Sequence, residues 1–264
     1  MNRFARTARS VAMSLRMVIL SANFWIAVAL IFGVLFAEIA EDVFSGYAGD
    51  GPDAFGAAYS FNISMHFGYF IYAAPLACAF AASGSLINDT EAGFYRLRLM
   101  KSGKHEYSIG MFIGTSIGGG LALMLGMLLF AIVCALQYGT RASIADMAAL
   151  DAWFPLVSST NAHWKYMIVS ALLAFLFGSL WSGVGLTVAV YSPVRYVSYL
   201  TPFIICFCSA LALPVSLQPL EMLVQMNWED FTFPKLLMYQ LVLYCAVMLW
   251  FDYVVERRII HEQN

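Results

Sequence analysis

The chain has 264 residues, of which 61% are apolar and only 11% charged, and its formal net charge is −2. Soluble domains usually carry about 25% charged residues, so this composition excludes a water-soluble enzyme, a disordered tail and a basic nucleic-acid-binding protein. A bilayer-spanning helix needs about 20 mainly apolar residues. The length therefore allows about six spans, and the expected fold class is all-α, a polytopic membrane protein with six transmembrane helices.

The first sixteen residues predict an amphipathic helix that lies in the inner membrane interface. Phe4, Ala8, Val11 and Leu15 recur at helical spacing, whereas the arginines fall largely on other faces. A secretory signal peptide is the alternative interpretation, but the basic region is long and the apolar stretch exceeds a usual signal-peptide core. We therefore expect residues 1–16 to form an interfacial helix that continues into the first span.

Six apolar stretches follow, and each is long enough to cross a bilayer without the alternation typical of barrel strands. They cover Val18–Ala37, Ile63–Ile87, Tyr107–Leu136, Tyr166–Tyr191, Val197–Val215 and Leu236–Val255. The third is long enough to tilt or to extend beyond the membrane, and Gly110, Gly114 and Gly118 within it allow close helix packing. No repeat or long linker divides the chain, so we expect residues 1–264 to form a single transmembrane permease domain.

Basic residues predict the orientation, because Lys and Arg collect on the cytoplasmic side of a membrane protein. With both termini in the cytoplasm, only three of the fourteen Lys and Arg residues lie outside, namely Arg141, Lys165 and Lys235. The predicted outer loops carry acidic residues instead. We therefore expect a multi-pass protein of the cell membrane with both termini cytoplasmic.

Groups for catalysis or metal binding are sparse in the sequence. No second ligand lies three or four residues after His66, and a hydrolase centred on Ser182 would lack a histidine base in the last two spans. Ser102-Gly103-Lys104 lacks the upstream glycine of a phosphate-binding loop, and the five cysteines lie in apolar stretches. We expect no enzyme activity, no metal site and no cofactor in this chain.

The longest internal connection, residues 88–106, predicts a short helix that is both apolar and basic. Asp89 or Thr90 can act as its N-cap, with Glu91 in the first turn, and Ser102-Gly103 ends it. Apolar residues recur three apart, and basic residues lie between them: Phe94, Leu97 and Met100; Arg96, Arg98 and Lys101. Such a helix suits docking into a groove of another protein. An amphipathic turn that rests on anionic headgroups is the alternative.

The segment Asp89-x-Glu91-x-Gly93, followed by an apolar turn, by Lys104-His105-Glu106 and by a glycine-rich span, resembles the permeases of the ABC-transporter type-2 family. Six spans, cytoplasmic termini and an N-terminal interfacial helix also match that family. The form Glu91-Ala92-Gly93-Phe94 is similar to the subgroup of lantibiotic and bacitracin self-protection permeases, which implies antibiotic resistance. Phe94 and Ser102 depart from the pattern, since many members have threonine and proline near these positions. Importer permeases with an EAA loop match less well, because Leu97 occupies the place of a glycine.

The resemblance implies the membrane subunit of an ATP-driven exporter. Such a subunit pairs with an identical or a different permease subunit and with a separate ATPase, which binds ATP and Mg. The residues implied to couple to that ATPase are Asp89, Glu91, Gly93, Phe94, Arg96, Leu97, Arg98, Lys101 and Lys104. The expected substrate is an amphipathic peptide, a lipid-like molecule or a drug, because the spans offer apolar surface and almost no charge-specific site. An ion-coupled secondary transporter and a six-span membrane hydrolase are the alternatives.

Residues 216–234 predict an apolar outer segment between the fifth and sixth spans, either re-entrant or interfacial. The resemblance implies an extracellular gate in this segment, for which Trp228, Phe231 and Phe233 are the candidates. The residue types themselves favour aromatic anchors at the membrane interface.

Overall fold

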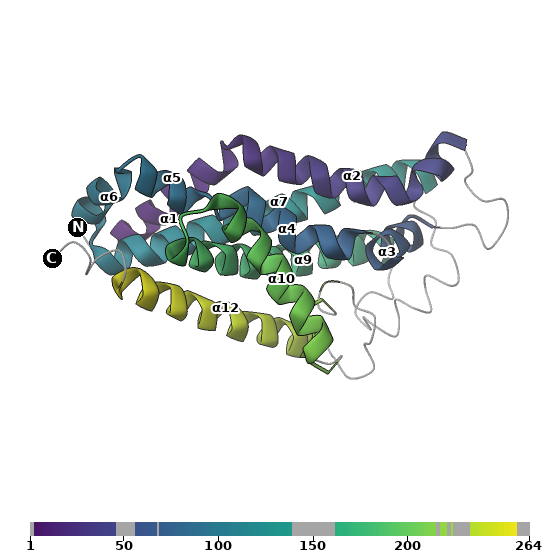
Figure 1. Cartoon of the computed structure of the whole chain (residues 1–264). Helices are drawn as coiled ribbons and strands as arrows, with labels where there is room; N and C mark the ends of the chain where they lie inside the picture. Colours follow the sequence, from purple (N-terminus) through teal and green to yellow (C-terminus); the bar gives the residue numbers. More distant parts are fainter. Residues whose placement is uncertain are drawn as a thin grey trace.

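The computed structural model describes residues 3–45, 56–67, 69–138, 162–214, 217–220, 223 and 233–257. Within these ranges the chain forms α-helices and no β-strand. The helices are α1 (Arg3–Ile19), α2 (Ala22–Ser45), α3 (Ala57–Phe67), α4 (Phe70–Ala82), α5 (Ser85–Glu91), α6 (Phe94–Ser102), α7 (Lys104–Tyr138), α9 (Ala162–Tyr191), α10 (Arg195–Ala212) and α12 (Phe233–Val255). Figure 1 shows them as an elongated bundle.

Six stretches of the described chain are long and apolar enough to cross a membrane. They are Ala22–Glu41, Phe70–Glu91, Lys104–Tyr138, Trp164–Tyr191, Arg195–Ala212 and Lys235–Val255. The predicted all-α fold and the predicted six spans are confirmed. The chain is a multi-pass membrane protein.

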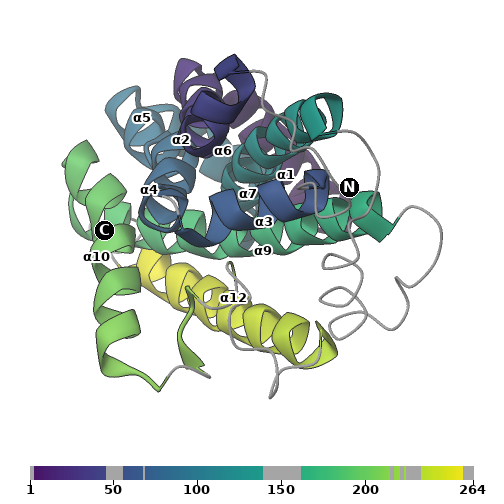
Figure 2. The ribbon, with the colours of Figure 1, turned by 90° about the vertical axis from the view of Figure 1, so that its right-hand side faces the viewer.

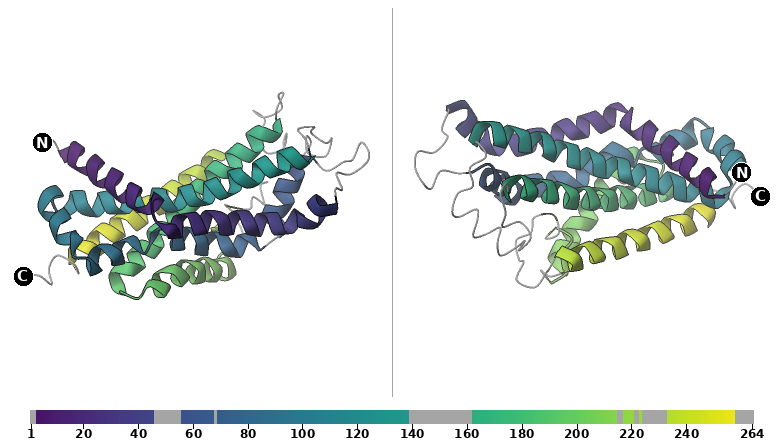
Figure 3. Two further views of the ribbon diagram at one scale, coloured as in Figure 1. Left: turned by 90° about the horizontal axis from the view of Figure 1, so that it is seen from above. Right: turned by 180° about the vertical axis from the view of Figure 1, so that it is seen from behind.

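The sequence predicts that the N-terminal helix continues into the first span, but the structure has a helix break between them. α1 ends at Ile19 and α2 begins at Ala22, because the Ser21 hydroxyl accepts a hydrogen bond from the backbone N–H of Phe24 at 3.2 Å and so caps α2. Figure 3 shows α1 inclined to α2. The membrane-interface position expected for residues 1–16 stays a prediction.

The second predicted span is also divided. The expected helix over Ile63–Ile87 is wrong in its continuity, since α3 ends at Phe67, α4 begins at Phe70 and α5 follows after a further bend at Ser83 and Gly84. α3 lies at the end of the bundle opposite α5 and α6 (Figure 1). α4 and α5 together form the candidate span Phe70–Glu91.

α7 is the central helix, and its glycines let three neighbours approach closely. Gly110, Gly114 and Gly118 face Ser10, Ser14 and Val18 of α1, so the two helices run in the same direction side by side. Gly119 and Gly120 face α9, and Gly126 faces α2. The predicted packing role of the first three glycines is confirmed. With 35 residues, α7 is about 52 Å long, which exceeds the ~30 Å hydrocarbon core.

α10 and α12 lie at the edge of the bundle and expose much of their apolar surface. In the end-on view they flank α9 on the side away from α1 and α2 (Figure 2). Ile204 and Leu211 on α10, and Val242 and Leu249 on α12, are each more than half exposed. Each helix is anchored by aromatic contacts, such as Phe80 with Tyr199 and Phe112 with Phe251.

The first and last described helices place both chain ends at the same end of the bundle, beside α5 and α6 (Figure 1). Side-chain contacts join helices there: Arg6 forms an ion pair with Glu106 and Arg195 with Glu91, and His105 Nδ1 lies 3.1 Å from Asp252 Oδ2. We call this end of the molecule the basic end, because ten of the twelve described Lys and Arg residues lie on α1, on α6, at the start of α7 or α10, or just after α12: Arg3, Arg6, Arg9, Arg16, Arg96, Arg98, Lys101, Lys104, Arg195 and Arg257.

Candidate functional site

α6 is a nine-residue helix between two glycines in conformations that other residues rarely adopt. Gly93 precedes it with φ 69° and Gly103 follows it with φ 91°. The predicted end at Ser102-Gly103 is confirmed. The predicted N-cap is wrong, because Asp89, Thr90 and Glu91 belong to the last turn of α5, and the Thr90 hydroxyl donates to the carbonyl oxygens of Leu86 and Ile87.

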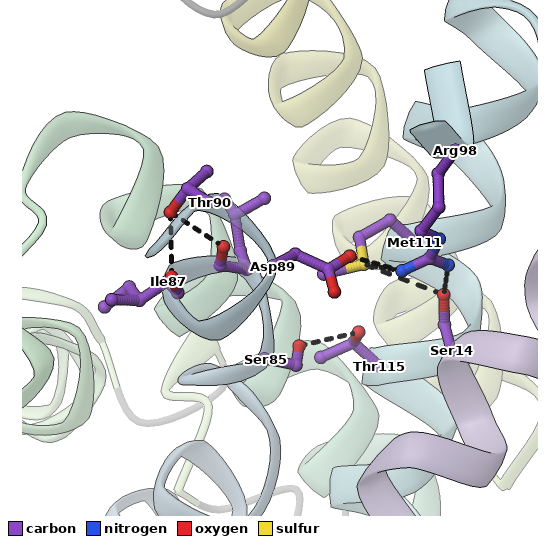
Figure 4. Close-up of polar contacts among 9 residues, drawn as sticks. Ser14, Ser85, Ile87, Asp89, Thr90, Arg98, Met111 and Thr115 are labelled. Carbon is purple, nitrogen blue, oxygen red and sulfur yellow. Dashed lines mark hydrogen bonds and ion pairs between the residues drawn. The ribbon is translucent and has the colours of Figure 1, made fainter. Parts of the chain in front are cut away.

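Arg98 of α6 and Asp89 of α5 form a buried ion pair. Only 6% of Arg98 and 4% of Asp89 is exposed, and Arg98 Nη1 donates a hydrogen bond to Asp89 Oδ2. The second guanidinium nitrogen, Nη2, donates to the hydroxyl of Ser14 on α1 at 2.6 Å. Figure 4 shows these side chains converging from three helices.

Two residues of α7 complete the surroundings of the guanidinium. Met111 Sδ lies 3.7 Å from Arg98 Nη1 and 3.6 Å from the Ser14 hydroxyl, and the Tyr107 ring lies 5.3 Å from the guanidinium carbon, in the range of a cation–π contact. Arg98 therefore contacts α5, α1 and α7 at once. Because an unpaired buried charge is strongly unfavourable, this arrangement holds α6 in one position. We call Ser14, Asp89, Arg98, Tyr107 and Met111 the arginine cluster.

The remaining side chains predicted for the coupling site lie outside this cluster. Phe94 and Leu97 are 56% and 52% exposed, and Met100, on the same helix, is 76% exposed. Arg96, Lys101 and Lys104 are exposed as well. Glu91 is exposed and pairs with Arg195 of α10, with 2.5 Å between Glu91 Oε2 and Arg195 Nη2.

The structure thus brings together two of the residues singled out in the sequence, Asp89 and Arg98, and leaves the others at the surface around them. Sequence reasoning missed Ser14, Tyr107 and Met111, because they lie far from α6 along the chain or inside an apolar stretch. The glycine spacing in α7 indicated that a helix packs closely there, but not that this helix is α1 or that it brings Ser14 to the site.

Ser182, considered in the sequence as a nucleophile, serves helix packing. Its hydroxyl donates to the carbonyl oxygen of Cys78 at 2.9 Å, and its side chain lies against Gly119. Among the described residues, no three His, Cys, Asp or Glu side chains are grouped as a metal site. Trp228 and Phe231, proposed for an outer gate, and most of the segment 216–234 lie outside the described residues, as does the side chain of Phe233.

Comparisons with models of protein families, with curated proteins and with solved structures find no match to this chain. The class of protein is therefore defined by the fold alone: a six-span α-helical membrane protein with a short helix, α6, held at one end of the bundle by a buried arginine.

Proposed function

We propose that the chain is the permease subunit of an ATP-driven exporter similar to the ABC-transporter type-2 family. It lies in the cell membrane with both termini in the cytoplasm, works with a separate ATPase and pairs with a second permease subunit. Its cargo is amphipathic: a peptide antibiotic, a lipid-like molecule or a drug. The ATPase subunit binds ATP and Mg, and this chain receives the resulting movement through α6.

The observation that carries the proposal is the attachment of α6 to the spanning helices. Arg98 joins α6 to α5, α1 and α7 through hydrogen bonds and a ring contact. A displacement of α6 is therefore transmitted through buried contacts to α1 and to the two spans that contain α5 and α7. Such closely packed contacts transmit strain better than an exposed loop does. Asp89 and Arg98 act in this proposal by positioning α6, because both are buried and paired.

The surface for the ATPase lies on the outer side of α6. Met100 and Arg96 project from this side at helical positions opposite the arginine cluster, and Met100 is the most exposed apolar residue of α6. A protruding apolar side chain with neighbouring positive charge suits insertion into a groove of a protein partner. The same exposure in a membrane protein also fits contact with lipid headgroups, so a partner-specific test is needed.

The exposed apolar sides of α10 and α12 are available for lipid or for the second permease subunit. Almost no charged side chain lies within these two helices between their ends. A cargo that crosses along such surfaces must carry apolar area of its own, which supports the proposed amphipathic substrate class.

The test compares Met100→Glu with Phe4→Glu, because both residues are highly exposed apolar side chains at the basic end, on α6 and α1 respectively. Each variant is expressed together with candidate ABC ATPases of the source organism and purified in mild detergent. We expect Met100→Glu to lose most of the cargo-stimulated ATP hydrolysis and the co-purified ATPase, and Phe4→Glu to retain both. Full hydrolysis and full co-purification in Met100→Glu would contradict the proposal.

An ion-coupled transporter is a second candidate, favoured by one small cavity with several polar side chains in its lining. It has a volume of about 80 Å³, lies where α1 meets α2 and α4 meets α5, and is lined by Ser21, Asn23, Ser85, Asn88 and Asp89 among others. Breaks between helices supply oxygen atoms that bind coupling ions in transporters. Cargo movement into ATP-free proteoliposomes, driven by a sodium or proton gradient and lost in Asp89→Asn, would favour this candidate over the exporter.

A further inference from the structure

A groove with a volume of about 300 Å³ separates α1 from the side of α6 that faces away from the proposed ATPase surface. Its lining combines positive charge with apolar surface. Arg6 and Arg9 of α1 and Lys101 of α6 supply charge beside Arg98, and none of the described residues that line the groove is acidic. Met13, Phe94 and Leu97 supply the apolar part.

The charges of this groove are only partly neutralised by the protein itself. Arg98 is paired with Asp89, and Arg6 lies 3.7 Å from Glu106. Arg9 and Lys101 have no ion-pair partner in the part of the chain that the structure describes. The groove therefore carries an excess of positive charge and favours an anionic occupant.

One further donor belongs to a residue of the groove and has no partner: Arg6 Nε makes no hydrogen bond among the described residues. The Ser10 hydroxyl is also without a hydrogen bond in the described part of the chain, but it is buried against Gly110 of α7. Guanidinium donors next to an ammonium group are a combination that binds phosphate oxygens.

The order of residues along α1 distinguishes a lipid from an acidic protein segment. Among the α1 residues that line the groove, the positive Arg6 and Arg9 come first and Met13 follows one turn later towards the first span, while Arg16 lies further along α1 and does not line the groove. An amphiphile whose phosphate lies at Arg9 would therefore extend its chain along Met13 in the direction of the bilayer. A water-soluble protein segment has no need of apolar surface on the membrane side.

From this gradient of charge we propose that the groove between α1 and α6 binds the phosphate headgroup of an anionic phospholipid. The lipid phosphate contacts Arg9 and Lys101, and the first part of an acyl chain lies on Met13 and Leu97. The site is independent of the proposed transport function, since it needs only the two helices and the membrane. It makes the position of α6 sensitive to the lipid composition of the membrane.

The experiment measures lipid binding to the purified full chain in neutral detergent by native mass spectrometry. Phosphatidylglycerol and phosphatidylcholine are titrated separately, and millimolar inorganic phosphate is a third arm. The groove variant is Arg9→Gln with Lys101→Gln. The matched control is Arg96→Gln with Lys104→Gln, which removes the same charge at exposed positions outside the groove. Met13→Glu is a second variant, which places an acid inside the groove.

We expect the wild type and the control to bind one phosphatidylglycerol at least about tenfold more tightly than phosphatidylcholine, and both groove variants to lose this preference. Equal affinity for the two lipids, or equal losses in the groove variant and the control, would overturn the proposal. The phosphate arm can also contradict the proposal. If inorganic phosphate displaces no lipid, yet raises the melting temperature of the wild type and the control but not of the groove variants, the occupant of the groove is a free anion. Retained lipid preference with loss of a co-purified ATPase in the groove variant would assign the groove to a protein and also overturn it.

Discussion

Arg98 shows how strongly the role of a charged residue depends on what surrounds it. In the sequence it is one of several basic residues on a short helix, yet in the structure it is buried and bound by Asp89, Ser14 and the Tyr107 ring. Arg96 and Lys101 on the same helix remain exposed. The difference arises because helical spacing places Arg98 towards α5 and α7, where a carboxylate and an aromatic ring replace the water that it loses.

Removing Arg98 should leave a buried carboxylate without its partner. We expect Arg98→Leu to lower the free energy of unfolding by about 3–5 kcal/mol, since Asp89 keeps its desolvation cost and loses its ion pair. Glu91→Gln is the control, because it breaks the exposed pair with Arg195 and should cost less than about 1 kcal/mol. Thermal unfolding in detergent measures both. Equal losses in the two variants would contradict the structural importance of the arginine cluster.

A substitution at Gly93 tests the backbone conformation alone, because no described residue other than the two chain neighbours lies within 4 Å of the position that a Cβ would occupy. Its φ of 69° is unfavourable for other residues, so Gly93→Ala should destabilise the protein by about 1 kcal/mol. Gly33→Ala is the matched control: Gly33 lies inside α2 with equally open space, and alanine there should be neutral or stabilising by up to about 1 kcal/mol. A gain in stability at both positions would show that Gly93 is not held in the left-handed region.

At the scale of helices, α7 organises the bundle because small residues appear on several of its faces. Composition and spacing predicted close packing at Gly110, Gly114 and Gly118, and the structure assigns these contacts to α1. The partner helix could not be predicted, since spacing shows which face is small but not which helix meets it. The breaks at Ser21 and at Phe67–Phe70 were missed because hydropathy is continuous across them.

A bulky residue at Gly114 should separate α1 from α7. A Cβ at this position would lie 2.6 Å from the carbonyl oxygen of Val11, a backbone atom that moves only if α1 shifts. We expect Gly114→Leu to reduce stability by about 1–3 kcal/mol and to make α1 more susceptible to protease. Gly33→Leu is the control, because no described residue apart from the chain neighbours lies within 4 Å of a Cβ at that position. Unchanged protection of α1 in Gly114→Leu would contradict the packing.

For the whole molecule, the start of α1 and the end of α12 lie at the same end of the bundle (Figure 1). The basic end carries α1, α6 and the end of α12, and the far end carries α3 and the end of α2 (Figure 1). The excess of Lys and Arg at the basic end supports the proposed cytoplasmic orientation. This orientation is itself open to a direct labelling test.

The labelling test uses single cysteines in a variant from which the five native cysteines have been removed. Phe44→Cys at the end of α2 and Met100→Cys on α6 replace residues that are 82% and 76% exposed, at opposite ends of the bundle. In intact cells, a membrane-impermeant thiol reagent should label Phe44→Cys and spare Met100→Cys. After the cells are broken, both should react. Labelling of Met100→Cys alone in intact cells would invert the proposed topology.

The amino-acid sequence alone determined the membrane class, the all-α fold, the six spans and the end of α6. Long apolar stretches favour spanning helices and a glycine favours a helix end, and both effects depend only on residues that are close in the sequence. Only the tertiary structure decided which charges are buried and which helix lies against α7. Asp89 and Arg98 are nine residues apart, while Ser14 is 84 residues from Arg98. Whether a charged side chain at such a site is paired or exposed depends on helices that meet only in the folded bundle. The packing of these helices determines both which side chains lose water and which partners they gain.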